Sequence, residues 1–156
     1  MISLSINVNK IALIRNSRSG NYPDVSSYAE KCINLGANGI TVHPRPDLRH
    51  IRPNDVREIS KIISKLSDVE FNVEGNPFSD QNENYPGLLK LVQQTRPDQC
   101  TLVPDSLDQL TSDHGFDLDA FGENLKPVID EIKSHGTRVS LFIDPEPRQI
   151  RNAARL

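Results

Sequence analysis

Short apolar runs rich in β-branched residues recur five times along the chain, and each is followed by a segment whose apolar residues are spaced for a helix. The runs predict strands at Leu4–Val8, Gly39–His43, Val69–Glu74, Gln99–Val103 and Arg138–Ile143. Because they are short and rich in apolar and β-branched residues, these runs are typical of strands in a parallel sheet that is covered on both faces.

Helical spacing fills the intervals between the runs. The pattern predicts helices at Asp24–Leu35, Pro53–Leu66, Pro86–Arg96 and Leu118–His135, and a fifth that begins near Arg148 and runs to Leu156. Pro53 and Pro86 suit a first helical turn, whereas Gly36 and Gly136 suit the left-handed residue that ends a helix. The one long loop that we expect is Gly75–Tyr85, which is polar and rich in asparagine.

The repeated order of strand and helix predicts an α/β fold with a parallel sheet and right-handed crossovers. Two architectures contain such a repeat. The first is a complete doubly wound, flavodoxin-like domain of five units, which has about this length. The second is the TIM-barrel type, of which these would be about the first five of eight βα units. Length favours the doubly wound domain, but the residues at the strand ends favour a single, partial TIM-barrel domain over residues 1–156.

Size, charge and cysteine content narrow the class of protein. The 156 residues suit one domain, and a net charge of −3 lacks the basic surplus that broad nucleic-acid binding needs. No apolar run approaches the roughly 18 residues of a membrane span, and no signal peptide precedes the first strand. Two cysteines are too few for a disulfide framework. We therefore expect a cytoplasmic protein that binds neither nucleic acid nor membrane.

Polar residues stand at the end of every predicted strand. In either architecture, catalytic groups collect beyond the carboxyl ends of parallel strands. His43 ends the second strand and Glu74 ends the third. The other strand ends supply Asn7, Val8 and Asn9, then Pro104 and Asp105, and finally Asp144. A histidine that titrates near neutrality and a carboxyl group whose pKa is raised by enclosure suit proton transfer.

Cationic side chains gather in the loops after the first two strands. They are Lys10, Arg15, Arg18, Arg45, Arg49 and Arg52. These residues predict binding of an anionic substrate, and the alternative is a solvated basic rim. Arg45 lies between two prolines, which stiffen its loop and lower the cost of ordering it on binding. The histidines lack metal-ligand spacing and no cysteine cluster joins them, so we expect no metal site.

Five motifs in this order resemble the pyridoxine 5′-phosphate synthase family of vitamin B6 biosynthesis, and together they span essentially the whole chain. The most specific is Gly39-Ile-Thr-Val-His-Pro-Arg-Pro-Asp-Leu-Arg-His-Ile51. The others are Asn7-Val-Asn-Lys-Ile-Ala-Leu-Ile-Arg-Asn-Ser-Arg18, Phe71-Asn-Val-Glu-Gly75, Leu102-Val-Pro104 with Thr111, and Val139-Ser-Leu-Phe-Ile-Asp144.

The resemblance implies a (β/α)₈ TIM barrel that works as a cytoplasmic homo-octamer without metal or organic cofactor. The implied activity is that of a transferase of pyridoxine biosynthesis. It condenses 1-deoxy-D-xylulose 5-phosphate with 3-amino-2-oxopropyl phosphate to pyridoxine 5′-phosphate, phosphate and water. His43 and Glu74 match the family's proton acceptors. Asn7 and Arg18 match contacts to the aminoketone phosphate, and Arg45, His50 and Thr111 match contacts to the deoxyxylulose phosphate.

Two departures from the family qualify this resemblance. Asn9 and Lys10 stand where the family usually has an acidic residue and a histidine. Lys10 can still meet an anion, so both stay candidate substrate-binding residues. The sequence also lacks the family's last three βα units, with their third catalytic histidine and glycine-rich phosphate loops. Five units would leave open sheet edges, so we expect marginal stability or association. The alternative function is a non-catalytic phosphometabolite-binding module or an inactive fragment.

Overall fold

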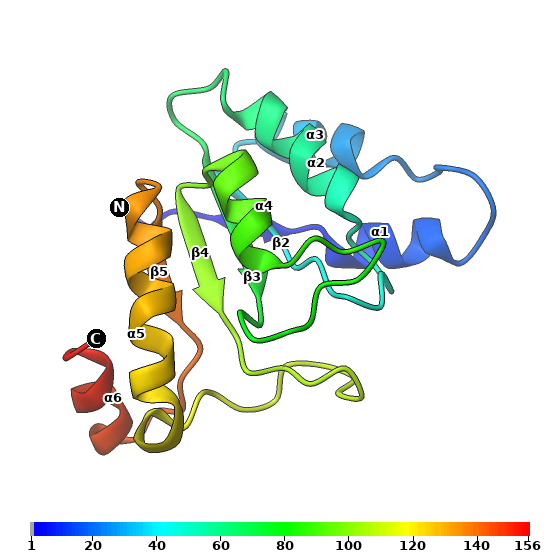
Figure 1. Cartoon of the computed structure of the whole chain (residues 1–156). Coiled ribbons are helices and arrows are strands. Elements are labelled where there is room, and N and C mark those ends of the chain that lie inside the picture. The colour runs from blue at the N-terminus through cyan, green and yellow to red at the C-terminus, as the bar shows by residue number, and fades with distance from the viewer. Residues whose placement is uncertain (1) are drawn as a thin grey trace.

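Five strands form a single parallel sheet in the computed structural model, which describes residues 2–156 (Figure 1). They are β1 (Ser5–Asn7), β2 (Gly39–Val42), β3 (Glu70–Gly75), β4 (Gln99–Leu102) and β5 (Arg138–Leu141). Every strand pairs with its neighbours in sequence, in the order β1-β2-β3-β4-β5. A doubly wound sheet reverses its order beside the first strand. The strand order is therefore that of an arc of a TIM barrel, and the flavodoxin-like alternative is wrong.

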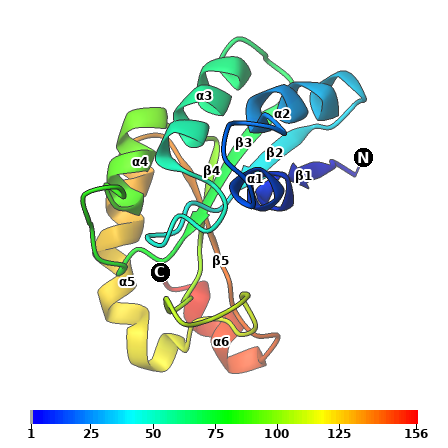
Figure 2. The same cartoon turned by 90° about the vertical axis from the view of Figure 1, so that its right-hand side faces the viewer.

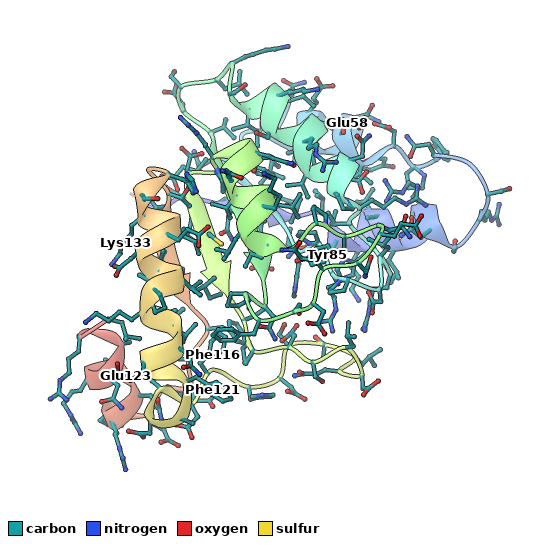
Figure 3. All side chains as sticks on the ribbon, viewed as in Figure 1. Glu58, Tyr85, Phe116, Phe121, Glu123 and Lys133 are labelled. Atoms are coloured by element: carbon teal, nitrogen blue, oxygen red, sulfur yellow. The ribbon has the colours of Figure 1, made fainter. Side chains whose placement is uncertain are left out.

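Helices α2 (Val25–Asn34), α3 (Pro53–Ile63), α4 (Leu88–Thr95) and α5 (Leu118–Ser134) all lie on one face of the sheet (Figure 2). Helix α6 (Pro147–Ala153) follows β5 and packs against α5. Alternate strand residues point at these helices and are fully buried, among them Ile40, Val42, Val73 and Leu102. They form the apolar core with the buried faces of α3, α4 and α5.

The opposite face of the sheet is lined by polar side chains rather than by the apolar ones that the sequence analysis expected. Ser5, Thr41, Asn72 and Thr101 lie side by side across four strands and hydrogen-bond through their side chains at 2.9 to 3.3 Å. At the amino-terminal end of this face, a hollow of about 540 Å³ opens between the strands. These polar residues lie within the predicted strands. That they share one face of the sheet follows from the register in which the strands pair.

Helix α1 (Asn9–Asn16) was not predicted and replaces the loop expected after the first strand. Val8 at its N-cap position offers no side-chain hydrogen bond, and the Asn7 Oδ1 instead accepts one from the Asn9 N–H at 2.9 Å. Its four apolar residues, 11–14, are also consecutive rather than spaced for a helix, and Leu13 and Ile14 remain exposed. Tertiary contacts of its last turn, described below, hold this short helix in place.

The other expected elements are present with shifted ends. Each strand boundary lies within two residues of its prediction. Helix α3 ends at Ile63 rather than Leu66, and α6 covers Pro147–Ala153 rather than Arg148–Leu156. Helix α4 begins at Leu88, because Gly87 with φ 88° precedes it and places Pro86 outside the helix. A second long irregular segment, residues 103–117, follows β4 in addition to the loop after β3. No helix within residues 2–156 is long and apolar enough to cross a membrane.

Gly115 lies where the segment before α5 crosses the end of β5. A Cβ atom there would stand 2.3 Å from the Ile143 Cα, a backbone contact that side-chain motion cannot relieve. We expect Gly115→Ala to destabilise the fold by about 1–3 kcal/mol or more, because the two segments must separate. Urea unfolding measures the change.

Gly122→Ala is the matched control for that experiment. A Cβ atom at Gly122, inside α5, would meet only the Leu156 Cδ2 at 3.9 Å, an ordinary van der Waals distance. Alanine also favours a helix over glycine by about 0.5–1 kcal/mol, so this variant is expected to be more stable than the original chain. A loss of stability at Gly122 as large as that at Gly115 would contradict the steric explanation.

Candidate active site

The carboxyl ends of β1, β2 and β3 bring three of the predicted residues together. Val42 pairs with Val73, and the next register position places His43 beside Glu74. Both point to the polar face of the sheet, since Thr41 and Asn72, two positions earlier on the same strands, are hydrogen-bonded there. The Asn7 Nδ2 lies 3.5 Å from the Glu74 Oε2. The sequence-based expectation that His43 and Glu74 share one edge of the sheet agrees with this geometry.

His43 is held rigidly and is only 7% exposed. Its backbone N–H donates to the Asn9 Oδ1 at 2.9 Å, so the side chain of Asn9 is used to fix the end of β2. Burial lowers the pKa of the His43 imidazole to about 4, and nearby Asp105 opposes that shift while His50, Arg45 and Arg49 add to it. The expectation that His43 titrates near neutrality is therefore wrong, because burial keeps its imidazole neutral at pH 7, where it can act as a proton acceptor.

The pKa of Glu74 is shifted upwards, opposite to that of His43. Burial, followed by repulsion from the Asp105 carboxylate, raises the pKa of the Glu74 carboxyl to about 7. At neutral pH this group exists in both protonation states, so it can accept a proton in one step and return it in another. Near pH 7 the Glu74 carboxyl can therefore both accept and donate a proton, whereas His43 is neutral and can act only as a proton acceptor.

His50 faces the same site from the loop after β2. Its ring centroid lies 5.9 Å from that of His43, and burial lowers its pKa to about 4. The Ile51 N–H donates to the His50 Nδ1 at 2.9 Å, which leaves the proton of the neutral ring on Nε2. This orientation presents a hydrogen-bond donor rather than a metal ligand. Within residues 2–156, no three His, Cys, Asp or Glu side chains are grouped so as to hold a metal ion.

Helix α1 supports the loop that carries His50. The Asn16 Nδ2 donates to the carbonyl oxygens of Leu48, Arg49 and His50 at 2.8 to 3.1 Å. The Arg15 Nη2 donates to the His50 carbonyl at 3.1 Å and to the Asp55 Oδ2 at 2.8 Å. Sequence reasoning assigned neither Asn16 nor Asp55 to the site, because their partners lie on different elements and only the tertiary contacts reveal them.

The arginines divide into buried and exposed groups, so a solvated basic rim is wrong for Arg15 and Arg45. Arg45 is 4% exposed, and its Nη1 donates to the Asp105 Oδ2 at 2.8 Å. Its Nη2 donates to the carbonyl of Ser106 at 2.6 Å. Arg49 bonds to Asp47 and to carbonyl oxygens of the β4–α5 segment. These two side chains therefore fasten the loop after β2 to the segment after β4.

Three predicted substrate contacts remain exposed to solvent. Lys10 lies in the first turn of α1 and Arg18 just beyond its end. Lys10 is close enough to His50 to help lower the pKa of that imidazole. Thr111 lies in the β4–α5 segment that Arg45 and Arg49 hold. Exposure leaves all three side chains free to meet a ligand, but the structure does not bring them into contact with His43 or Glu74 within the described residues.

Comparison with known proteins gives the family. The family model for "Pyridoxal phosphate biosynthesis protein PdxJ" matches residues 4–156. A pyridoxine 5′-phosphate synthase of Xylella fastidiosa (strain M23) is 56% identical over 151 residues, which are 97% of this chain and 58% of that protein. One of Xanthomonas campestris pv. campestris (strain B100) is 56% identical over 153 residues, 98% of this chain and 59% of the relative.

The matched region agrees with the elements described above. It includes all five strands and both loops that carry the candidate residues, and the chain spans about three fifths of the length of these relatives. These matches, together with the strand order, show that the chain belongs to the PdxJ family of pyridoxal phosphate biosynthesis proteins.

Proposed function

We propose that this protein is a cytoplasmic pyridoxine 5′-phosphate synthase of the TIM-barrel type, to which residues 1–156 contribute one partial domain. The reaction joins 1-deoxy-D-xylulose 5-phosphate and 3-amino-2-oxopropyl phosphate to give pyridoxine 5′-phosphate, phosphate and water. The observation that carries the proposal is the placement of His43 beside Glu74 at the carboxyl edge of the sheet. The relatives named pyridoxine 5′-phosphate synthase support it.

Proton transfer is the main chemical demand of this reaction. Condensation of an amine with a ketone, elimination of water and ring closure each move protons on carbon, nitrogen or oxygen. The neutral His43 imidazole accepts a proton at the outset, and Glu74, with a pKa near 7, accepts and returns one in the following steps.

Phosphate binding is the second demand. Asn7, Arg18 and the neighbouring Asn9 and Lys10 are proposed to bind the aminoketone phosphate. Arg45, His50 and Thr111 are proposed to bind the deoxyxylulose phosphate. His50 suits this role through the proton on its Nε2, and Arg45 through its planar guanidinium, which matches phosphate geometry. We also propose that the working protein is a homo-oligomer, an octamer by resemblance.

A non-catalytic phosphometabolite-binding module is the second candidate. The exposed cations Lys10 and Arg18 favour it, because they can bind an anion without any contribution from His43 or Glu74.

One experiment on this chain separates the two functions. Isothermal calorimetry with each phosphate substrate measures binding, and a coupled assay measures formation of pyridoxine 5′-phosphate. Binding of both substrates with product formation is the expected result. Binding without product would favour the module, and failure to bind either substrate would overturn both functions for this chain.

A further inference from the structure

Asp105, directly after β4, connects three loops at the carboxyl edge of the sheet. Its Oδ2 accepts hydrogen bonds from the Arg45 Nη1 at 2.8 Å and from the Ser112 Oγ at 2.6 Å. Its carbonyl oxygen accepts one from the Asn76 Nδ2 at 3.0 Å. The residue thereby joins the loops after β2, β3 and β4. It is buried, with 4% of its surface exposed.

The ion pair between Arg45 and Asp105 leaves part of its hydrogen-bonding capacity unused. The Arg45 Nε and the Asp105 Oδ1 are buried and have no hydrogen-bond partner within residues 2–156. Both residues line a small cavity of about 10 Å³, together with His43, Asn76 and Tyr85. A buried pair with unsatisfied atoms is a weak source of stability, because desolvation cancels much of the attraction. Stability alone therefore explains this pair poorly.

The Asp105 charge acts on both members of the proton-transfer pair. Burial is the larger cause of the raised pKa of Glu74, and the Asp105 charge adds to it; the same charge raises the pKa of His43 against the effect of burial. The other charged or titratable groups near His43 are His50, Arg45 and Arg49. Near Glu74 lies the Cys100 thiol, whose own pKa is raised to about 12 by burial and which is therefore uncharged at neutral pH. Asp105 is thus the anion that the two groups share.

We propose that Asp105 is a positioning residue of the site, which holds the Arg45 guanidinium between the loops after β2 and β4 and places a buried negative charge beside Glu74. The inference rests on the proposed function for its catalytic consequence. That consequence is twofold. The charge adds to the effect of burial in keeping a proton on part of the Glu74 population near neutrality, and it balances the buried charge of Arg45.

Asp105→Asn tests the inference because it removes the charge and keeps the size and a hydrogen-bond acceptor. We expect the pKa of Glu74, followed by carbon-13 NMR of its carboxyl group, to fall by up to about one pH unit, since burial still raises it after the Asp105 charge is lost. The smaller, uncharged Asp105→Ser gives the same test if the amide prevents folding. In an active preparation, the limb of the pH–rate profile that reports Glu74 is expected to move to lower pH by the same amount.

Ser112→Ala is the matched control, since it removes the other partner of the Asp105 Oδ2 and leaves the charge in place. The pKa of Glu74 should not change in this variant. An unchanged pKa in folded Asp105→Asn, or an equal fall in Ser112→Ala, would overturn the proposal. The NMR measurement needs no turnover, so failure of the proposed synthase activity would show separately, as absence of product in the original chain.

Discussion

Replacing His43 with alanine is expected to lower the turnover of pyridoxine 5′-phosphate formation by about 10²-fold or more, because the site then lacks a positioned base. His43 is 7% exposed, and burial holds the pKa of its imidazole at about 4, so the base is almost wholly neutral at pH 7. Water has little access to the same position and is a far weaker base. The measurement is kcat from a product assay under saturation with both phosphate substrates.

The control for this prediction is a histidine outside the site. His135 caps the carboxyl end of α5 and is far along the chain from the loops that carry the candidate residues. His135→Ala should leave turnover unchanged, which separates loss of the base from a general effect of removing an imidazole. Substrate affinity measured by calorimetry should change little in His43→Ala. Full turnover in that variant would remove His43 from the mechanism.

Removing the Asp55 carboxylate is expected to destabilise the fold by about 3–5 kcal/mol, since it leaves the Arg15 guanidinium buried without its counter-ion. Arg15 is 1% exposed and Asp55 is 6% exposed. The Asp55 Oδ2 also accepts a hydrogen bond from the Arg52 N–H at 2.7 Å, which supports the start of α3. Asp55→Ala therefore affects the α1–α3 contact and the loop that presents His50. Urea unfolding, monitored by circular dichroism, measures the loss.

An exposed ion pair in the same chain provides the comparison. Arg138 and Glu70 lie 2.6 Å apart at the other end of the sheet, with side chains 55% and 58% exposed. Because solvent screens such a pair, Glu70→Gln should lower the free energy of unfolding by no more than about 1 kcal/mol. Replacing Arg15 and Asp55 together with Met and Leu should recover much of the loss in Asp55→Ala. An equal loss of unfolding free energy in Asp55→Ala and Glu70→Gln would contradict the claim that burial makes the loss of Asp55 more destabilising.

The regular elements of the fold were largely predictable because their signals are local. Short runs of apolar and β-branched residues, together with helical spacing, located the five strands and five of the six helices within residues 2–156. The helix ends at Gly36 and Gly136 were also correct, since the positive φ of 100° and 82° at these residues favours glycine. Helix α1 was missed because its stability comes from Arg15 and Asn16, whose partners are on the loop after β2 and on α3.

The sequence predicted which residues lie at the same edge of the sheet, because strand ends determine that position. It did not predict which side chains bind one another there. His43 and Glu74 follow neighbouring parallel strands, so their shared edge follows from topology. Their burial, and the direction in which it shifts each pKa, depends on the packing of the surrounding loops. The contact of Arg45 with a substrate stays a prediction, but its ion pair with Asp105, sixty positions away, could not be foreseen from the sequence.

The amino-acid sequence by itself determined the alternation of strands and helices, the residues available at the strand ends and the similarity to one enzyme family. These properties depend on local periodicity and on residue type. Only the tertiary structure decided the barrel-type strand order, the polar face of the sheet and the buried contacts Arg15–Asp55 and Arg45–Asp105. Each of these joins residues distant in sequence, and which of them meet is determined by the packing of the whole chain.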